Sequence, residues 1–156
     1  MNISAFSRFH LGNLFNRNSK GFTLIELLIV IAILGILAAA VLVAINPGKR
    51  TRQAQDAKRK NDIGAIATEV QGYYTSPGAG KYPAGLSVLT IDGYLKSMPL
   101  DPTGNTAYLY DLNTDTTEAA TGATIAEPTS GTGTWIWCWK SSTNVATEVT
   151  NGTCTL

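Results

Sequence analysis

The longest apolar segment of the chain runs from Phe22 to Ile45 and predicts a membrane-spanning helix. All of its 24 residues are apolar, Gly or Thr, except Glu26. At about 1.5 Å per residue, such a helix measures about 36 Å and can cross a hydrocarbon core of about 30 Å. A core helix of a soluble protein would be apolar on one face only. Glu26 is the one residue that a simple membrane anchor does not need.

The pattern changes after Asn46-Pro47-Gly48, a sequence that either interrupts a helix or caps a new one. Apolar residues then recur at steps of three and four, which predicts an amphipathic helix with one face toward a core. This face comprises Ala54, Ala57, Ile63, Ile66, Ala67, Val70, Tyr73 and Tyr74. The turn residues Ser76-Pro77-Gly78 predict its end.

The rest of the chain predicts a short helix and a small antiparallel sheet. Leu86, Leu89, Ile91 and Leu95 are expected in the core, and strands are expected at residues 107–112, 122–126, 134–140 and 144–150. Alternation along the third strand places Trp135, Trp137 and Trp139 on one face. We expect a loop or a neighbouring subunit to cover these rings. The predicted fold class is α+β, with a long N-terminal helix packed on a small C-terminal antiparallel sheet.

Charge is distributed unevenly after the apolar run. Residues 49–60 hold six basic residues and one acidic residue, a net charge of +5. Residues 61–156 hold three basic and nine acidic residues, a net charge of −6. The basic segment is either a solvated helix face beside the membrane, able to bind anionic lipid headgroups, or a surface that faces the acidic part of a neighbouring subunit. The overall charge gives no reason to expect specific nucleic-acid binding.

The residues before the apolar run end in a short, distinctive motif. Residues 1–21 contain three basic residues and no acidic residue. An ordinary secretory signal would have a small-residue cleavage site after its apolar region, and none follows Ile45. Residues 20–28, KGFTLIELL, closely resemble the processing motif of type IV prepilins and type II secretion pseudopilins.

This resemblance implies specific chemistry at the start of the apolar run. In the family, a membrane peptidase cuts after the glycine, here Gly21, and methylates the new N-terminal amine, here that of Phe22. The family's buried glutamate corresponds to Glu26. Glu26 is either an idle residue of an anchor or a device for assembly, and we favour assembly. Its carboxylate would meet the Phe22 amine of a neighbouring subunit and set the register of the helices.

The resemblance divides the chain into four parts. These are a leader that is removed (1–21), a transmembrane and assembly helix (22–45), its amphipathic continuation (46–76) and a globular β-rich head (77–156). Basic residues flank both ends of the apolar run, so they do not fix its orientation. The two cysteines, Cys138 and Cys154, fit one disulfide in an oxidising compartment. We therefore expect the head outside the cytoplasm and the leader inside it.

Chemistry other than assembly has little support in the sequence. Asp111, Asn113 and Asp115 alternate like the first ligands of a calcium loop, but Thr116 stands where the loop glycine belongs and Gly122 where the final glutamate belongs. We therefore expect an acidic hairpin there, and no cofactor. The one histidine lies in the leader, and no catalytic set of Ser, His and Asp is evident. The chain is not expected to be an enzyme.

The predicted function is that of a structural subunit of a type IV pilus-like surface filament. The expected partners are further copies of the chain, a prepilin peptidase, an inner-membrane assembly platform and, before assembly, membrane lipid. The expected location is the inner membrane, and a cell-surface or periplasmic filament after assembly. One alternative is a pseudopilin of a type II secretion system, which residues 93–105, GYLKSMPLDPTGN, also resemble. A second alternative is a lone membrane-anchored binding module that uses the Trp face or the acidic loop.

Overall fold

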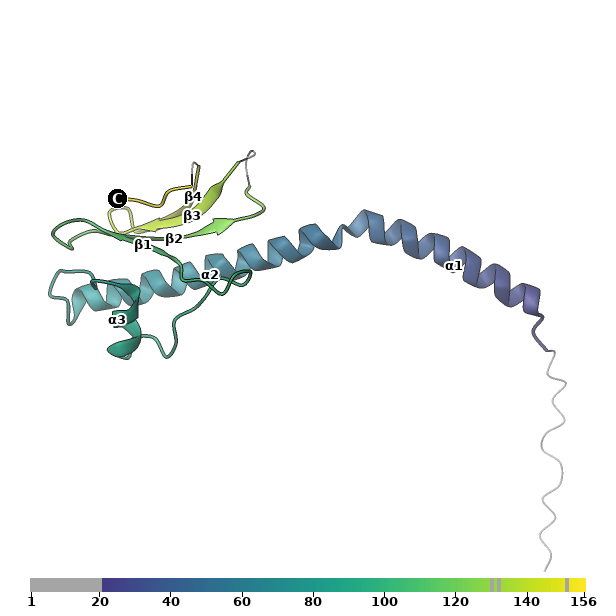
Figure 1. Ribbon diagram of the computed structural model, residues 1–156, viewed down its shortest axis with the longest axis horizontal. Helices are drawn as coiled ribbons and strands as arrows, with labels where there is room; N and C mark the ends of the chain where they lie inside the picture. The colour runs from purple at the N-terminus through teal and green to yellow at the C-terminus, as the bar shows by residue number, and fades with distance from the viewer. Residues whose placement is uncertain (1–20, 130, 132, 151) are drawn as a thin grey trace, which may run out of the picture. The chain divides into compact units, whose positions relative to one another are not determined.

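The computed structural model describes residues 21–129, 131, 133–150 and 152–156, so the predicted leader lies outside it except for Gly21. The described residues divide into two units, with the boundary between Ala44 and Ile45. Within the described residues the elements follow the order α1, α2, α3, β1, β2, β3, β4 (Figure 1). A long N-terminal helical stretch followed by a small antiparallel sheet confirms the predicted α+β class.

Helix α1, Leu24–Ile45, is apolar on every face, and none of its residues is buried. Its large side chains are between 47% (Val30) and 83% (Val43) exposed. The helical stretch that it opens is the one candidate for a membrane span in the part of the chain that the structure describes. A helix without a polar face requires lipid or other helices around it.

Helix α2, Pro47–Thr75, begins directly after Asn46. Asn46 adopts a left-handed φ of 46°, which asparagine tolerates, and its side-chain oxygen accepts a hydrogen bond from the Lys49 backbone N–H at 3.2 Å. Pro47 occupies the start of the helix, where a backbone N–H has no intrahelical partner to lose. The Asn-Pro-Gly sequence therefore ends one helix and caps the next.

The four strands form an antiparallel meander in the order β1-β2-β3-β4. They are β1 Leu109–Leu112, β2 Ala119–Ile125, β3 Trp135–Lys140 and β4 Val145–Thr150. The predicted segments agree with these strands to within two residues, except that β2 begins at Ala119 instead of Gly122. The side chain of Asn113 accepts hydrogen bonds from two backbone N–H groups of the β1–β2 turn, which lets strand pairing reach back to Ala119.

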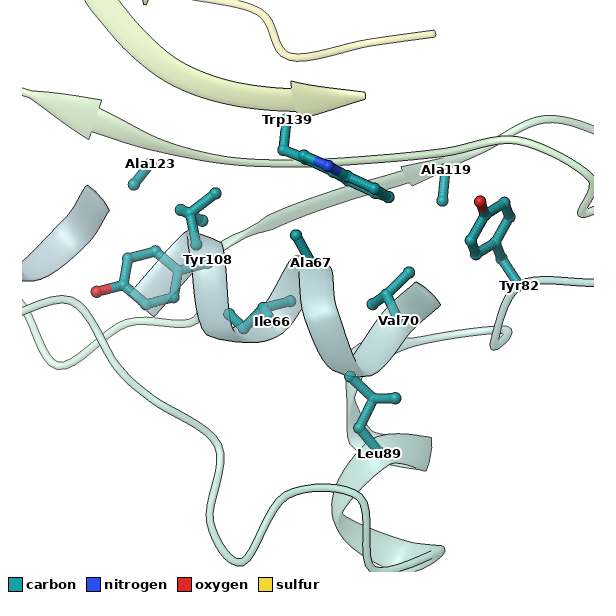
Figure 2. Packing of buried hydrophobic residues seen from close by; sticks show 10 residues of the cluster. Ile66, Ala67, Val70, Tyr82, Leu89, Tyr108, Ala119, Ala123 and Trp139 are labelled. Carbon is teal, nitrogen blue, oxygen red and sulfur yellow. The ribbon is translucent and has the colours of Figure 1, made fainter. Parts of the chain in front are cut away.

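The head packs on α2, which contacts β2 and β3 of the sheet and also α3, Leu86–Ile91. Figure 2 shows Trp139 between the sheet and α2, with Leu89 on the side of the helix away from the sheet. The buried cluster comprises Ile63, Ile66, Ala67, Val70, Tyr82, Leu89, Tyr108, Ala119, Ala123 and Trp139. Removing this apolar surface from water holds the helix on the sheet.

Three residues that the sequence placed in the core are exposed. Ala54 and Ala57 of α2 face solvent, while Asp56 and Arg59 are buried in the same turns. Near the N-terminal end of α2, the head offers the Asp101 carboxylate to Arg59 and two backbone N–H groups to Asp56. The helix therefore turns its charged residues toward the head there, and its alanines face solvent. Ile91, the last residue of α3, is 79% exposed because this short helix buries Leu89 instead.

The tryptophans of β3 are covered mainly by the chain's own helix. Trp139 is 4% exposed and belongs to the core, and Trp137 packs against the same cluster. Lys60 Nζ of α2 lies 4.5 Å from the centroid of the Trp137 ring, within range of a cation–π contact. The expected cover by a loop or a neighbouring subunit was therefore wrong for these two rings. Trp135 lies beside loop residue Gly131, where a Cβ would come within 3.3 Å of the ring.

Candidate functional site

Helix α1 begins with reciprocal hydrogen bonds between Thr23 and Glu26. The Thr23 backbone N–H donates to Glu26 Oε2 at 2.9 Å, and the Thr23 hydroxyl donates to the same oxygen at 2.6 Å. The Glu26 N–H donates to Thr23 Oγ1 at 3.3 Å. This is a capping box, with Thr23 as the N-cap. We missed this signal in the sequence, although Thr-x-x-Glu before an apolar run is its usual form.

The capping box holds the Glu26 carboxylate close to the chain end that cleavage after Gly21 would create. Phe22 directly precedes Thr23, and both Gly21 and Phe22 are exposed. The carboxylate of Glu26 accepts both of its hydrogen bonds at Oε2, and Oε1 accepts none from the described residues. Because a carboxylate has acceptor sites on both oxygens, Glu26 can accept from a further donor, such as a protonated amine, without losing the cap.

A second charged cluster joins the first half of α2 to the head. The guanidinium of Arg59 donates to Asp101 Oδ2 at 2.6 Å and Oδ1 at 3.0 Å, and to Asp56 Oδ1 at 2.7 Å. Asp56 also accepts hydrogen bonds from the backbone N–H groups of Ala126 and Glu127 at 2.7–3.0 Å. One buried helical turn thereby holds both the loop before β1 and the end of β2.

The electrostatics of this cluster favour its charged form. Hydrogen bonds from Arg59 hold the pKa of Asp101 well below its usual range, despite the opposing effect of burial. Thr103 adds two hydrogen bonds to the same carboxylate. In return, the hydrogen bond to Asp101 raises the pKa of Arg59 against the effect of burial, and Asp56 adds to the rise. A buried ion pair of this kind is stable only when each charge has its partners.

Two more ion pairs connect α2 to the head. Arg52 Nε lies 2.7 Å from Glu127 Oε1, and Lys60 Nζ lies 2.9 Å from Glu148 Oε1. Burial acts to raise the pKa of Glu148, but hydrogen bonds from Lys60 and Thr129 outweigh it and lower that pKa. The chain's own head therefore supplies acidic partners for Arg52 and Lys60 of the basic segment.

A disulfide joins Cys138 of β3 to Cys154 near the C-terminus. Cys154 lies on the face of the sheet away from α2, where Gly122 of β2 makes room for it. A Cβ at Gly122 would come within 2.9 Å of Cys154 Sγ. Further along, the Leu156 N–H donates to Asp111 Oδ2 of β1 at 3.2 Å. The C-terminal segment thus crosses the sheet from β3 to β1 and covers part of its outer face.

Replacing both cysteines, Cys138→Ser with Cys154→Ser, is expected to lower the free energy of unfolding by about 3 kcal/mol. The reason is that a closed loop with a sequence separation of 16 becomes an open chain in the unfolded state. Urea unfolding of the mature protein in detergent, followed by tryptophan fluorescence, measures the change. Wild-type protein under reducing conditions should unfold at the same urea concentration as the variant. An unchanged midpoint in both samples would contradict the expectation.

The calcium-like residues Asp111, Asn113 and Asp115 lie at the end of β1 and in the turn to β2. The Asn113 side chain stabilises the turn itself, because its Oδ1 accepts hydrogen bonds from two backbone N–H groups at 2.8 and 3.0 Å. Asp111 accepts a hydrogen bond from the backbone N–H of Leu156 in the C-terminal segment. Among the described residues, no group of three or more His, Cys, Asp or Glu side chains is placed to hold a metal ion.

Comparison with known proteins identifies the family of the chain. Residues 16–42 match the prokaryotic N-terminal methylation motif. Over 105 residues, the chain is 40% identical to the type II secretion system core protein G of Pseudomonas aeruginosa, and the alignment covers 57% of this chain and 71% of the relative. The chain belongs to the type IV pilin and type II secretion pseudopilin family. The resemblance of residues 20–28 is thereby confirmed.

Two further relatives extend the similarity over most of the chain. The core protein G of Vibrio cholerae is 33% identical over 141 residues, which cover 80% of this chain and 94% of the relative. The fimbrial protein EcpC of Eikenella corrodens is 31% identical over 141 residues, which cover 86% of this chain and 90% of the relative. No solved structure gives a significant match.

Family membership fixes the general role of the pilin-like chain. Pilins and pseudopilins are structural subunits, so the prediction that the chain is not an enzyme is confirmed. Membership also implies assembly into a filament and processing by a prepilin peptidase. The exposed apolar surface of α1 fits anchoring in the inner membrane before assembly.

Proposed function

We propose that this pilin-like subunit is a pseudopilin of a type II secretion system. The observation that carries the proposal is the 40% identity to the Pseudomonas aeruginosa core protein G. The alignment with the Vibrio cholerae core protein G, over 94% of that relative, adds support from nearly its whole length. The sequence alone led us to favour a surface pilus, and these relatives favour the alternative.

In the proposed pathway the chain is first a membrane protein and then a filament subunit. Residues 22–45 anchor it, with the leader in the cytoplasm and the head, residues 77–156, outside. The peptidase removes residues 1–21, and an inner-membrane assembly platform transfers the subunit from lipid to the filament. The exposed apolar surface of α1 supports this pathway, because that surface can face lipid before assembly and other helices after it.

Glu26 is proposed to align the incoming subunit. Cleavage creates an amine on Phe22, and a protonated amine is a strong donor to a carboxylate. The unused Oε1 of Glu26 supports this role, since a neighbour's amine can bind there while Oε2 remains in the cap. Apolar helices slide past one another at little cost, so one charged contact can select a single register.

Mass spectrometry of mature protein is expected to show an N-terminal methylated Phe22. The motif match at residues 16–42 supports this expectation. A Gly21→Val variant should keep its leader and remain unmethylated, because in the resembling family the peptidase cuts after glycine. Assembled material that still begins at Met1 would contradict the proposed processing.

Deleting the gene is expected to stop export of enzymes through the type II pathway and to leave surface fibres unchanged. Export is measured as secreted activity in the culture medium relative to a cytoplasmic marker, and fibres by electron microscopy of sheared material. Restoring the gene should restore export. Loss of fibres with normal export would instead support a surface pilus, which the match to EcpC favours. A deletion that changes neither would point back to a lone binding module.

A further inference from the structure

The basic segment at the start of α2 contains two kinds of basic residue. Among residues 49–60, the side chains that form ion pairs within the chain are Arg52, Lys58, Arg59 and Lys60. Lys49 and Arg50 differ, because both are exposed and neither forms an ion pair with any residue that the structure describes. Two adjacent positive charges are thus left for a partner outside the chain.

The sequence places these two charges at a defined depth. Helix α1 has 22 residues, and about 1.5 Å per residue gives about 33 Å, close to the thickness of a hydrocarbon core. Lys49 and Arg50 follow within a few residues of its last residue, Ile45. While α1 spans the membrane, chain connectivity keeps both side chains within reach of the headgroups at that surface.

The local helix adds positive potential to the same place. Lys49 and Arg50 lie in the first turn of α2, which contains no acidic residue. The N-terminal end of a helix carries partial positive charge, so acidic side chains are favoured there and basic ones are disfavoured. Lys49 and Arg50 are therefore repelled by the partial positive charge of the helix end and by each other. A bound external anion would reduce this repulsion.

We propose that Lys49 and Arg50, at the N-terminal end of α2, bind the phosphates of anionic phospholipids while the subunit waits in the membrane. Arginine forms paired hydrogen bonds with phosphate, and lysine contributes a mobile positive charge. The contact specifies the class of lipid around the unassembled subunit and must break when the subunit enters a filament. The proposal rests on the membrane-anchored stage of the proposed function.

The test uses full-length mature protein in nanodiscs made of equal amounts of phosphatidylglycerol and phosphatidylcholine. Native mass spectrometry of the released protein measures which lipid stays bound. Wild-type protein is expected to retain phosphatidylglycerol in preference. The double variant Lys49→Gln with Arg50→Gln should reduce this preference about 25-fold, which is about 5-fold for each charge near a membrane surface.

The matched control removes two charges elsewhere in the chain. Lys81 and Lys96 are exposed residues of the head that form no ion pair with the described residues. The variant Lys81→Gln with Lys96→Gln has the same net charge as the test variant and should keep the wild-type preference. An equal loss of the preference for phosphatidylglycerol in both variants would overturn the proposal, since overall charge would then explain the binding. An unchanged preference in the test variant would overturn it as well.

Assembly is measured separately, so that the two proposals can fail independently. If the test variant keeps its lipid preference but loses filaments, Lys49 and Arg50 bind a neighbouring subunit and the lipid proposal is wrong. If wild-type protein shows no lipid preference yet supports secretion, the lipid proposal fails and the pseudopilin function stands.

Discussion

Replacing Arg59 with methionine is expected to destabilise the head by about 3 to 5 kcal/mol, the usual effect of removing one partner from a buried ion pair. The Arg59 side chain is 7% exposed, and it lies between the side chains of Asp56 and Asp101, which are 6% and 15% exposed. Methionine fills much of the same space but donates no hydrogen bond. Two carboxylates would then be buried close together without their cation.

Urea unfolding of the mature protein in detergent measures this effect, because the buried Trp139 reports on the core. The matched control is Arg52→Met in the same helix. The Arg52 side chain is 50% exposed and pairs with Glu127, so its loss should change the free energy of unfolding by no more than about 1 kcal/mol. Equal destabilisation by the two variants would mean that burial of the Arg59 cluster is unimportant.

The same cluster predicts a loss of stability in acid. The pKa of Asp101 is lowered in the folded protein from an ordinary value of 3.8, first by hydrogen bonds from Arg59. A carboxyl group of this kind contributes stability above its unfolded-state pKa, and the contribution is lost as the pH falls below that value. An Asp101→Asn variant should therefore lose less stability than wild type between neutral pH and pH values below 3.8.

The long apolar run and the amphipathic repeat could be predicted because each signal is local. The 22-residue segment of α1, apolar except for Glu26 and Gly35, and the recurring core residues of α2 define their helices without knowledge of the rest of the chain. The Thr23–Glu26 cap was equally local. It was missed because Glu26 was interpreted only as a charge in a membrane segment, and the cap is a property of the helix start.

The partners of Asp56 and Arg59 could not be predicted in the same way. They lie at Asp101 and at the backbone of Ala126 and Glu127, which are 42 to 71 residues away along the chain. A charged residue in an amphipathic repeat is expected to face solvent unless such distant partners are known. Alanine, in contrast, is small enough to lie either on the buried face or on the solvent face of a helix. The alanines of this segment therefore did not predict which face is buried.

Replacing Glu26 with glutamine is expected to reduce filament assembly sharply while the subunit is still inserted and cleaved. Removing a charge from an apolar helix makes membrane insertion easier, so the anchor should be unaffected. What is lost is the charge-assisted hydrogen bond to a neighbour's Phe22 amine, a contact worth about 1.5 to 3 kcal/mol. At each subunit addition, this corresponds to about a 10- to 150-fold weaker preference for the correct register.

The structure makes glutamine the informative substitution, because it separates the charge of Glu26 from its role in the cap. Glutamine at this position of a capping box can still accept the Thr23 N–H, so the start of α1 is preserved. Thr23→Ala is the complementary variant, since it removes the hydroxyl of the cap and keeps the carboxylate. Mature subunit in the membrane fraction and filament in the sheared fraction are measured for both. If the charge aligns the subunits, Glu26→Gln loses filaments and Thr23→Ala keeps most of them. The opposite pattern would assign Glu26 to the helix cap alone, and a neighbour's amine would have no part in its function.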